Sequence, residues 1–238
     1  MILSYHSLDS SGSVISLPPA EFRFQMDCLG ASGRRVVPLV DLPREPDGVA
    51  ITFDDAFLSV YQTAFPILQE HRFPATVFVV TGHCGGFNDW SSQPAGIPRL
   101  ELMSWQQTDE VSRYGVSIGA HTVTHPRLSQ LDDVAVEREL VESRDEIQNR
   151  LGGAVETFAY PYGDHNVSVR NAAAEHFRIS CGTTLDFNSP SSPLSDLPRL
   201  DVYYLQSRFL FRNLVKGNGG SYIFARRSLR ALRSLVAS

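Results

Sequence analysis

Long hydrophobic runs and cysteine are both scarce in this sequence. No stretch reaches the ~18 consecutive apolar residues that a membrane-spanning helix needs, and residues 1–6 lack the basic and apolar regions of a signal peptide. The three cysteines, Cys28, Cys84 and Cys181, are widely spaced and form no CxxC pair. We therefore expect neither a disulfide framework nor a thiolate zinc site, and we expect a cytoplasmic protein.

Acidic residues are absent after Asp201. The formal net charge of the whole chain is −5, so the part before this basic stretch is strongly acidic. Nucleic-acid-binding proteins rarely place so acidic a body beside their basic element, and we therefore expect no nucleic-acid partner. The basic residues of the stretch are Arg208, Arg212, Lys216, Arg226, Arg227, Arg230 and Arg233.

The composition is otherwise that of a folded protein with a sizeable core, since 42% of its 238 residues are hydrophobic and 20% are charged. Short apolar runs alternate with helical patterns, which is typical of βα repeats around a parallel sheet. We expect one α/β domain over residues 1–205 and a basic, helical appendage over 206–238. The predicted strands are 2–5, 35–39, 49–53, 76–80, 116–120, 157–160, 179–182 and 199–203. The predicted helices are 19–32, 57–71, 104–114, 132–151 and 167–176.

The first segment with candidate chemistry is Thr52-Phe53-Asp54-Asp55-Ala56. It follows a predicted strand, and catalytic groups of barrel-like α/β folds collect at the carboxyl ends of the strands. Two adjacent carboxylates at a buried position repel each other unless a cation compensates. A bound metal would do so, and it would keep the second carboxylate ionised as a general base. The alternative is a helix start, with the two aspartates as cap and first-turn residue.

The second segment is His121-Thr122-Val123-Thr124-His125-Pro126. Histidines at i and i+4 on one turn point the same way and can bind one ion, although a pair with this spacing also arises by chance. Two histidines and one carboxylate form a ligand set of hydrolytic zinc sites, which leave positions open for water and substrate. The first two segments therefore support each other.

The third segment is Phe158-Ala159-Tyr160-Pro161-Tyr162-Gly163. It is either a strand that ends in a turn with aromatic rings packed in the core, or a rigid turn that presents backbone N–H groups and an aromatic wall to a ligand.

These three segments, in this order, resemble the sequence motifs of the polysaccharide deacetylases, the NodB-homology family of carbohydrate esterases. The likeness runs from about Ile2 to about Val202 and includes the surrounding residues 73–78 and 119–120. The resemblance implies a distorted (β/α)7 barrel. It also implies that Asp55, His121 and His125 bind one divalent metal ion, zinc in the first place, with cobalt, nickel or iron as alternatives.

Further roles follow from the same resemblance. Asp54 would be the general base that activates water, and the backbone N–H of Tyr162 would help to stabilise the tetrahedral oxyanion. The chain departs from the family at Ala56, where glycine is usual, and at Ala159, where many members have an arginine that orients the base. Arg199 is our candidate for replacing that arginine.

The general acid is a further departure, because no histidine follows His176, whereas many members supply this acid from a late Leu-x-His motif. The start Ser4-Tyr5-His6 is similar to a permuted subgroup resembling the deacetylases of poly-N-acetylglucosamine, in which the acid comes from the first strand. His6 is therefore the candidate acid, and a buried, hydrogen-bonded core histidine is the alternative. We expect His71, His83, His165 and His176 at the surface or in loops.

The implied reaction is hydrolysis of an N-acetyl group of a sugar or glycan intermediate, which gives acetate and a free amine. A hydrolase of non-sugar amides or cyclic imides on the same barrel is one alternative, and a catalytically silent carbohydrate-binding relative is another. Trp90 is a candidate sugar platform or a core residue, and for Trp105 we expect core packing.

The basic tail has its own pattern. Leu229, Leu232, Leu235 and Val236 recur at three- and four-residue steps with arginines between them, which predicts a basic amphipathic helix. Such a helix either lies on the barrel, with its arginines paired to the acidic body, or makes peripheral contact with an anionic membrane.

Overall fold

The computed structural model describes residues 1–236, with side chains as far as Arg230. The side chains of Leu232, Leu235 and Val236, which belong to the predicted apolar stripe of the tail, therefore lie outside the described part. Within residues 1–236, no helix is both long enough and apolar enough to cross a membrane.

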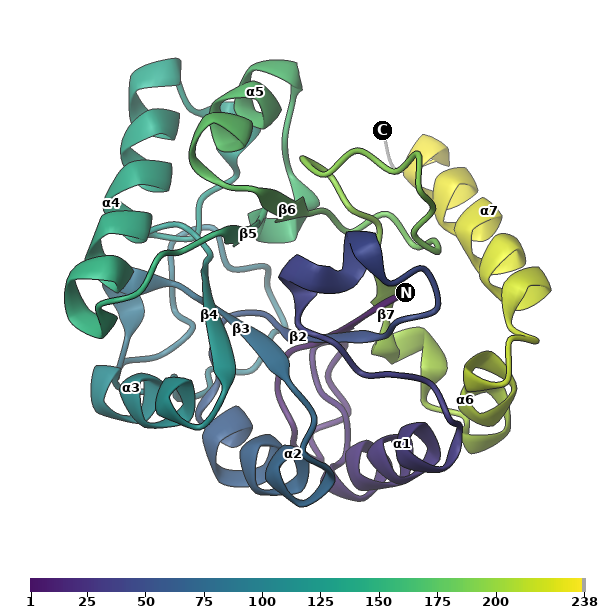
Figure 1. The fold of residues 1–238 in the computed structure, drawn as a ribbon. Coiled ribbons are helices and arrows are strands. Elements are labelled where there is room, and N and C mark those ends of the chain that lie inside the picture. Colours follow the sequence, from purple (N-terminus) through teal and green to yellow (C-terminus); the bar gives the residue numbers. More distant parts are fainter. Residues whose placement is uncertain (237–238) are drawn as a thin grey trace.

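A curled sheet of seven parallel strands forms the centre of the molecule (Figure 1). Its strand order is β6-β5-β4-β3-β2-β1-β7, so the strands follow one another around a barrel in chain order and the seam lies between β6 and β7. This arrangement confirms the predicted α/β fold, a distorted seven-stranded barrel. The strands are β1 Ile2–Tyr5, β2 Ala50–Phe53, β3 Ala75–Val79, β4 Val116–Ala120, β5 Thr157–Ala159, β6 Ile179–Cys181 and β7 Leu200–Asp201.

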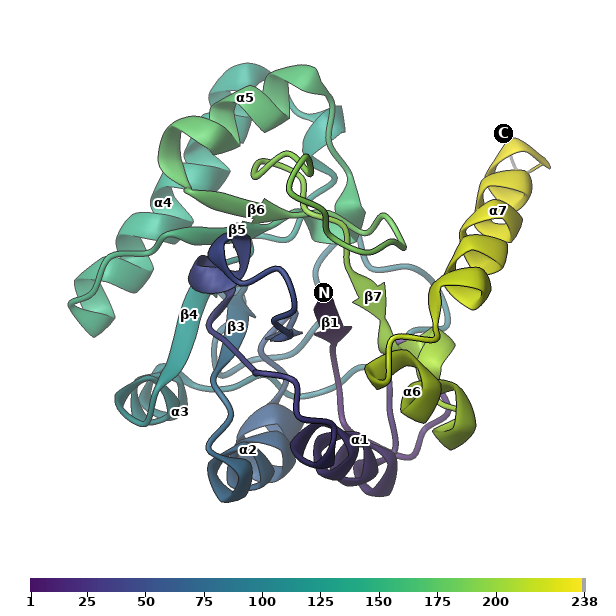
Figure 2. The same ribbon diagram turned by 45° about the vertical axis from the view of Figure 1, so that its right-hand side comes forward.

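Helices surround the sheet, and local sequence signals define their ends. The side chain of Ser104 accepts a hydrogen bond at the start of α3 within a capping box, Asp132 caps α4, and Gly152 ends α4 in the left-handed conformation. The helices are α1 Pro19–Ala31, α2 Phe65–His71, α3 Trp105–Arg113, α4 Asp133–Leu151, α5 Val167–His176, α6 Arg208–Val215 and α7 Gly220–Val236. Figure 2 shows α6 and α7 on the side of the barrel where β7 lies.

Alternate residues of each strand face opposite sides of the sheet and build two separate cores. Leu3 and Ile51 belong to the layer between the sheet and the helices, whereas Ile2, Ala50 and Phe78 face the barrel interior. Because the interior is filled by side chains, the polar residues collect at the carboxyl ends of the strands.

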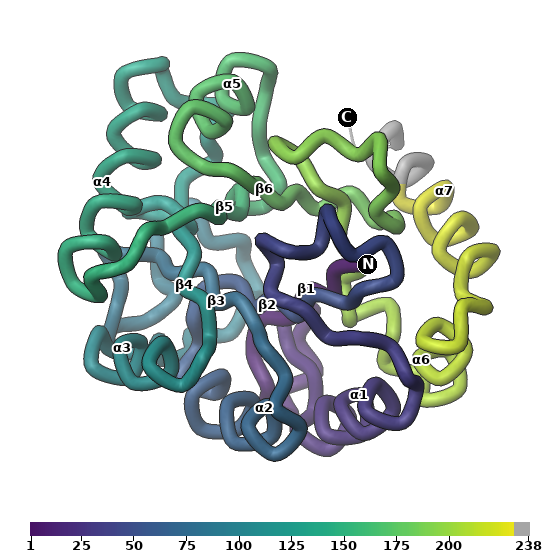
Figure 3. Tube along the Cα trace, viewed as in Figure 1, coloured from purple at the N-terminus to yellow at the C-terminus, as the bar shows by residue number. Residues whose placement is uncertain are grey.

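The strand predicted over residues 35–39 is wrong. Val36 forms only an isolated bridge with Val49, Pro38 has no N–H for a ladder, and a 3-10 helix runs over Leu39–Arg44. Its apolar residues Val37, Leu39 and Leu42 pack into the interior core instead. Figure 3 shows this segment running across one open end of the barrel, beside the N-terminus.

Two other predicted boundaries also differ. The helix predicted over 57–71 begins one residue later, at Leu58, because Phe57 forms an antiparallel bridge with Leu102, and it contains a π segment at Val60–Ala64 before α2. The strand predicted over 199–203 is shortened to β7, because the Asp201 side chain accepts the N–H of Tyr203 and starts the 3-10 turn Val202–Leu205.

Candidate active site

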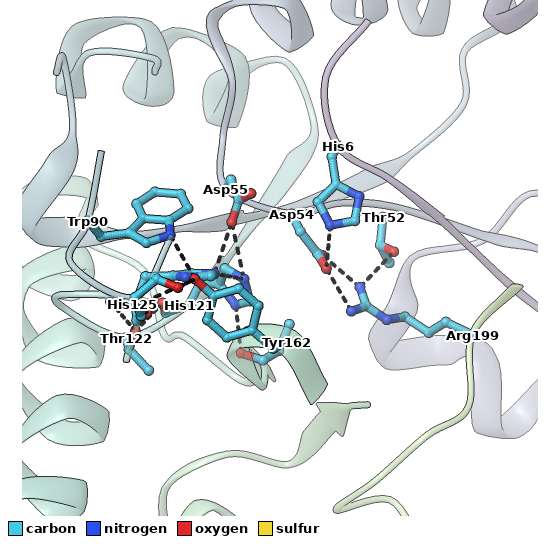
Figure 4. A network of polar contacts seen from close by, with 12 residues as sticks. His6, Thr52, Asp54, Asp55, Trp90, His121, Thr122, His125, Tyr162 and Arg199 are labelled. Carbon is cyan, nitrogen blue, oxygen red and sulfur yellow. Dashed lines mark hydrogen bonds and ion pairs between the residues drawn. The ribbon is translucent and has the colours of Figure 1, made fainter. Parts of the chain in front are cut away.

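The predicted site residues meet at one end of the barrel (Figure 4). His6 follows β1, and Asp54 and Asp55 follow β2. His121 and His125 come after β4, and Tyr162 comes after β5. Parallel strands bring residues that are far apart in the sequence to the same edge of the sheet.

Three donor atoms form a nearly equilateral triangle. Asp55 Oδ1 lies 3.3 Å from His121 Nε2 and 3.3 Å from His125 Nε2, and the two histidine atoms are 3.2 Å apart. Donors bonded to one tetrahedral zinc at ~2.0–2.1 Å lie about 3.3–3.4 Å apart. The three buried side chains therefore have the spacing that one small metal ion requires.

The environments of His121 and Asp55 also suit a metal. His121 Nδ1 lies 2.7 Å from the carbonyl oxygen of Ala159, which can only accept, so Nδ1 carries the proton and Nε2 turns its lone pair toward Asp55. Asp55 Oδ1 is buried and has no hydrogen-bond partner. Converging lone pairs around a buried oxygen without a proton donor are unfavourable unless a cation lies between them.

Electrostatics keep the ligands in their metal-binding forms. Burial raises the pKa of Asp55, but the electrostatic and hydrogen-bonding contacts with the imidazoles of His125 and His121 hold it well below its usual range. Burial lowers the pKa of His125 more than Asp55 raises it. An ionised carboxylate and a neutral imidazole are the states in which these groups bind metals.

The backbone of the site is held in an uncommon conformation. Five residues without the freedom of glycine have φ values between 56° and 68°: Asp55, Ala56, Thr122, His125 and Tyr162. Each such left-handed residue costs about 1 kcal/mol or more, and strain of this kind concentrates at functional sites. Ala56, at a position where the family usually has glycine, adopts φ 56°.

Asp54 is held by Arg199. The guanidinium donates to both carboxylate oxygens, from Nη1 to Oδ1 at 2.6 Å and from Nη2 to Oδ2 at 2.7 Å. Both side chains are buried. Burial raises the pKa of Asp54, but the charge and the hydrogen bonds of Arg199, together with His6 and His121, bring it below its usual value. Asp54 therefore stays ionised, and the geometry of the pair is fixed.

The charges of the site fit a divalent cation. Asp54 and Asp55 carry two negative charges, and Arg199 neutralises only one of them. A buried, uncompensated carboxylate is strongly unfavourable. Together with the spacing of the donor atoms, this charge imbalance shows that the residues fit a bound metal ion.

His6 lies on the opposite side of Asp54 from the triangle, with Nε2 3.8 Å from Asp54 Oδ2 (Figure 4). It shares a small pocket with Asp201, a residue that the sequence analysis did not single out. Burial raises the pKa of Asp201, and the charge of His6 opposes this shift. The position of Asp201 at the end of β7 could have identified it as a site residue, because His6, Asp54 and His121 also stand at the ends of strands.

Trp90 and Tyr162 form a wall beside the ligands. The Trp90 ring lies 4.1 Å from the ring of His125, and its Nε1 donates to the Tyr162 hydroxyl at 3.0 Å. The Ser92 hydroxyl donates to the His125 carbonyl oxygen at 2.6 Å. Because Trp90 is only 4% exposed, it packs against a ligand side chain and is not an open sugar platform.

Of the remaining histidines, His83 packs edge-on against Trp90, and the others contact other residues. His165 contacts Asp196 at 3.2 Å and packs against the Tyr160 ring. His71 pairs with Asp27. Trp105 is half-buried against the outer core, below the guanidinium of Arg150.

Comparison with known proteins places the chain in a family. A model of the polysaccharide deacetylase family matches residues 41–177, which is more than half of the sequence. The chain therefore belongs to the polysaccharide deacetylase family.

Individual relatives agree with this assignment. YxkH of Bacillus subtilis (strain 168), which is named for the same family, is 27% identical over 180 residues, covering 72% of this chain and 60% of that protein. The poly-beta-1,6-N-acetyl-D-glucosamine N-deacetylase of Staphylococcus aureus (strain MSSA476) is 27% identical over 124 residues, 48% of this chain and 40% of that protein. The chain thus matches only part of the length of both relatives.

A solved structure supports the fold. The structure of IcaB from Ammonifex degensii superposes with a TM-score of 0.75 at 23% identity, and the match covers 92% of this chain and 97% of that one. At this identity the likeness concerns the barrel and not the substrate.

Proposed function

We propose that this protein is a metal-dependent deacetylase that hydrolyses the N-acetyl group of an N-acetylated sugar or glycan to acetate and a free amine. The observation that carries the proposal is the triangle of Asp55, His121 and His125 donor atoms, 3.2–3.3 Å apart, beside a carboxylate fixed by Arg199. Membership of the polysaccharide deacetylase family supports it.

The reaction uses the residues around the triangle. A divalent ion, zinc in the first place, would supply a Lewis acid for the acetamide carbonyl and lower the pKa of water. Asp54 accepts the proton of the attacking water, while Arg199 keeps the carboxylate ionised and oriented. The backbone N–H of Tyr162 donates to the oxyanion, and protonated His6 gives a proton to the leaving amine.

The substrate class rests on the relatives. One of them is named for poly-beta-1,6-N-acetyl-D-glucosamine, and this supports an N-acetylhexosamine oligomer or a lipid-linked intermediate as the substrate here. Cytoplasmic residence stays a prediction, and it favours a biosynthetic intermediate over a finished wall polymer.

A substrate panel tests the reaction. The zinc-loaded full chain is expected to release acetate from N-acetylglucosamine oligomers, with no ring opening of cyclic imides. Ring opening without acetate release would move the activity to the imide alternative. Absence of both reactions, with zinc bound, would leave a silent carbohydrate-binding relative.

The C-terminal helix suggests a second partner. The side chains of α7 that face away from the barrel include Phe224, 62% exposed, and Leu229, 50% exposed. Three of its arginines turn inward: Arg227 pairs with Asp186, and Arg226 and Arg230 lie against the Tyr204 ring. Phe224 and Leu229 therefore form an uncovered apolar face among the described residues, whereas Ile223 of the same helix is buried.

We propose that this face contacts an anionic lipid surface. Exposed cations accompany it on and after α6, namely Arg212 and Lys216, whereas Arg208 is paired with Glu21; no acidic residue follows Asp201. A second copy of the chain would bring like charges together, which opposes pairing through the same face. Each basic residue near an anionic membrane contributes ~1 kcal/mol, an effect that salt weakens.

Vesicle sedimentation tests the contact. The full chain is expected to sediment with phosphatidylserine vesicles at low salt, less at high salt, and not with phosphatidylcholine alone. The double variant Phe224→Ser, Leu229→Ser should bind several-fold more weakly, whereas Val134→Ser, at an 81% exposed position on α4, should not change binding. Equal, salt-insensitive sedimentation of all three would make α7 a structural element only.

A further inference from the structure

Glu139 is a buried carboxylate on α4 that points at the loop between the two histidines. It is 4% exposed and accepts three hydrogen bonds. The N–H groups of Val123 and Thr124 donate to Oε2 at 2.7 and 3.0 Å, and the Thr124 hydroxyl donates to Oε1 at 2.7 Å. Burying a carboxylate is unfavourable unless such donors satisfy it, so this contact is specific.

No cation neutralises Glu139 among the described residues. The ion pairs of its helix involve other acids, with Arg144 bound to Asp145 and Arg150 bound to Glu146. The carboxylate therefore depends on the loop for its partners. Charge-assisted bonds of this kind are roughly twice as strong as neutral ones.

The loop that Glu139 holds is strained at both ends. Thr122 has φ 68° and His125 has φ 56°, and the residues bonded to Glu139 lie between them. Inside the loop the N–H of His125 donates to the Thr122 hydroxyl at 3.0 Å. A strained turn persists only when its surroundings hold it. The three bonds to Glu139 do so, together with the N–H groups of Thr81 and Gly82, which donate to the carbonyl oxygens of Thr122 and Val123.

We propose that Glu139 is a positioning residue of the metal site. Its two oxygens fix the backbone at Val123 and Thr124, so that His121 and His125, on either side, bring their Nε2 atoms to 3.2 Å. The inference rests on the proposed metal site of these histidines. An amide weakens this contact, because its neutral oxygen accepts the two N–H groups without the charge assistance of a carboxylate, and its NH2 group forces the Thr124 hydroxyl to turn its own proton away.

Zinc affinity is the primary test, measured by competition with a chromophoric chelator. Glu139→Gln should weaken zinc binding about 10–100-fold, the usual effect of removing an outer partner of a metal ligand. Thr124→Val removes one of the three bonds and should cause a smaller loss. Glu142→Gln, the same substitution at an exposed position of α4, should leave the affinity unchanged. At saturating zinc, the KM for the sugar should change little in all variants.

Amide hydrogen exchange in the metal-free protein separates positioning from general destabilisation. In Glu139→Gln the N–H groups of Val123 and Thr124 should exchange faster, while those of β3 stay protected. Zinc affinity within threefold of the wild type, or unchanged exchange at these two amides, would overturn the inference. If Glu139→Gln does not fold, Thr124→Val decides by zinc affinity alone, and an affinity equal to that of the wild type would then overturn the inference. Tight zinc binding by a wild type that releases no acetate would contradict the proposed reaction and leave the role of Glu139 intact.

Discussion

Asp54 and Arg199 are the two residues whose pairing most directly affects the proposed chemistry. Arg199 donates from both terminal nitrogens to Asp54 and from Nε to the Gly182 carbonyl oxygen at 2.9 Å. It thus ties Asp54, the proposed general base, to the end of β6, across the seam of the barrel. Lysine could not provide the same fork of donors.

Arg199→Met is expected to shift the acid side of the pH profile upward. The charge of Arg199 lowers the pKa of Asp54, so its removal raises that pKa, and the base becomes protonated at higher pH. The acid limb of kcat/KM should therefore move to higher pH, together with lower stability because a buried carboxylate loses its partner. Arg138→Met, at an exposed position on α4, is the control. An acid limb at the wild-type pH would show that Arg199 does not control the pKa of Asp54. If Arg199→Met does not fold, Arg199→Lys should show an intermediate shift.

His6→Ala tests the general acid. The variant should keep its zinc, because His6 is not part of the ligand triangle, but its kcat should fall by ~10²–10⁴-fold. The alkaline limb of the pH–rate profile should weaken as well. An unchanged profile would assign the acid to another group. His165 is then a poor substitute, since it contacts Asp196 and Tyr160 rather than Asp54.

At the scale of elements, Gly119 in β4 determines how closely the strand that precedes His121 can approach its neighbours. A Cβ at this position would lie 2.5 Å from Thr157 Oγ1 and 2.6 Å from the Phe78 ring. Gly119→Ala should therefore destabilise the protein by about 1–3 kcal/mol. It should also weaken zinc binding, because His121 lies two residues further along the chain. Gly153→Ala, where nothing lies within 4 Å, is the matched control. Urea unfolding of both variants with equal midpoints would show that β4 can accommodate the methyl group.

Local patterns account for the parts of the structure that could be predicted. Buried strands such as β2 and β4 appear as apolar runs, and the polar residues directly after them, Asp55 and His121, meet because parallel strands end at one edge. Glu139 and Asp201 were missed, because their importance depends on which loop or strand packs beside them. The segment 35–39 has the composition of a strand. Because Pro38 cannot donate to a strand ladder, the segment instead packs its apolar residues into the open end of the barrel.

At the scale of the whole molecule, the barrel closes only partly, and the candidate active site lies beside the strands that close it. β7 pairs with β1 over two residue positions, Leu3 with Leu200 and Ser4 with Asp201. The seam toward β6 is bridged by the chain before β7, where the N–H of Gly182 donates to the Leu197 carbonyl oxygen at 3.0 Å. The pairing of β1 with β7 places His6, directly after β1, next to Asp201 at the end of β7.

The most direct test of the proposed function is to measure zinc content and acetate release on the same preparations. The wild type should bind one zinc ion per chain and lose acetate release when a strong chelator removes it. His125→Ala should contain no zinc and release no acetate, whereas His71→Ala, a surface variant, should match the wild type. Undiminished acetate release by metal-free His125→Ala would contradict the proposed function.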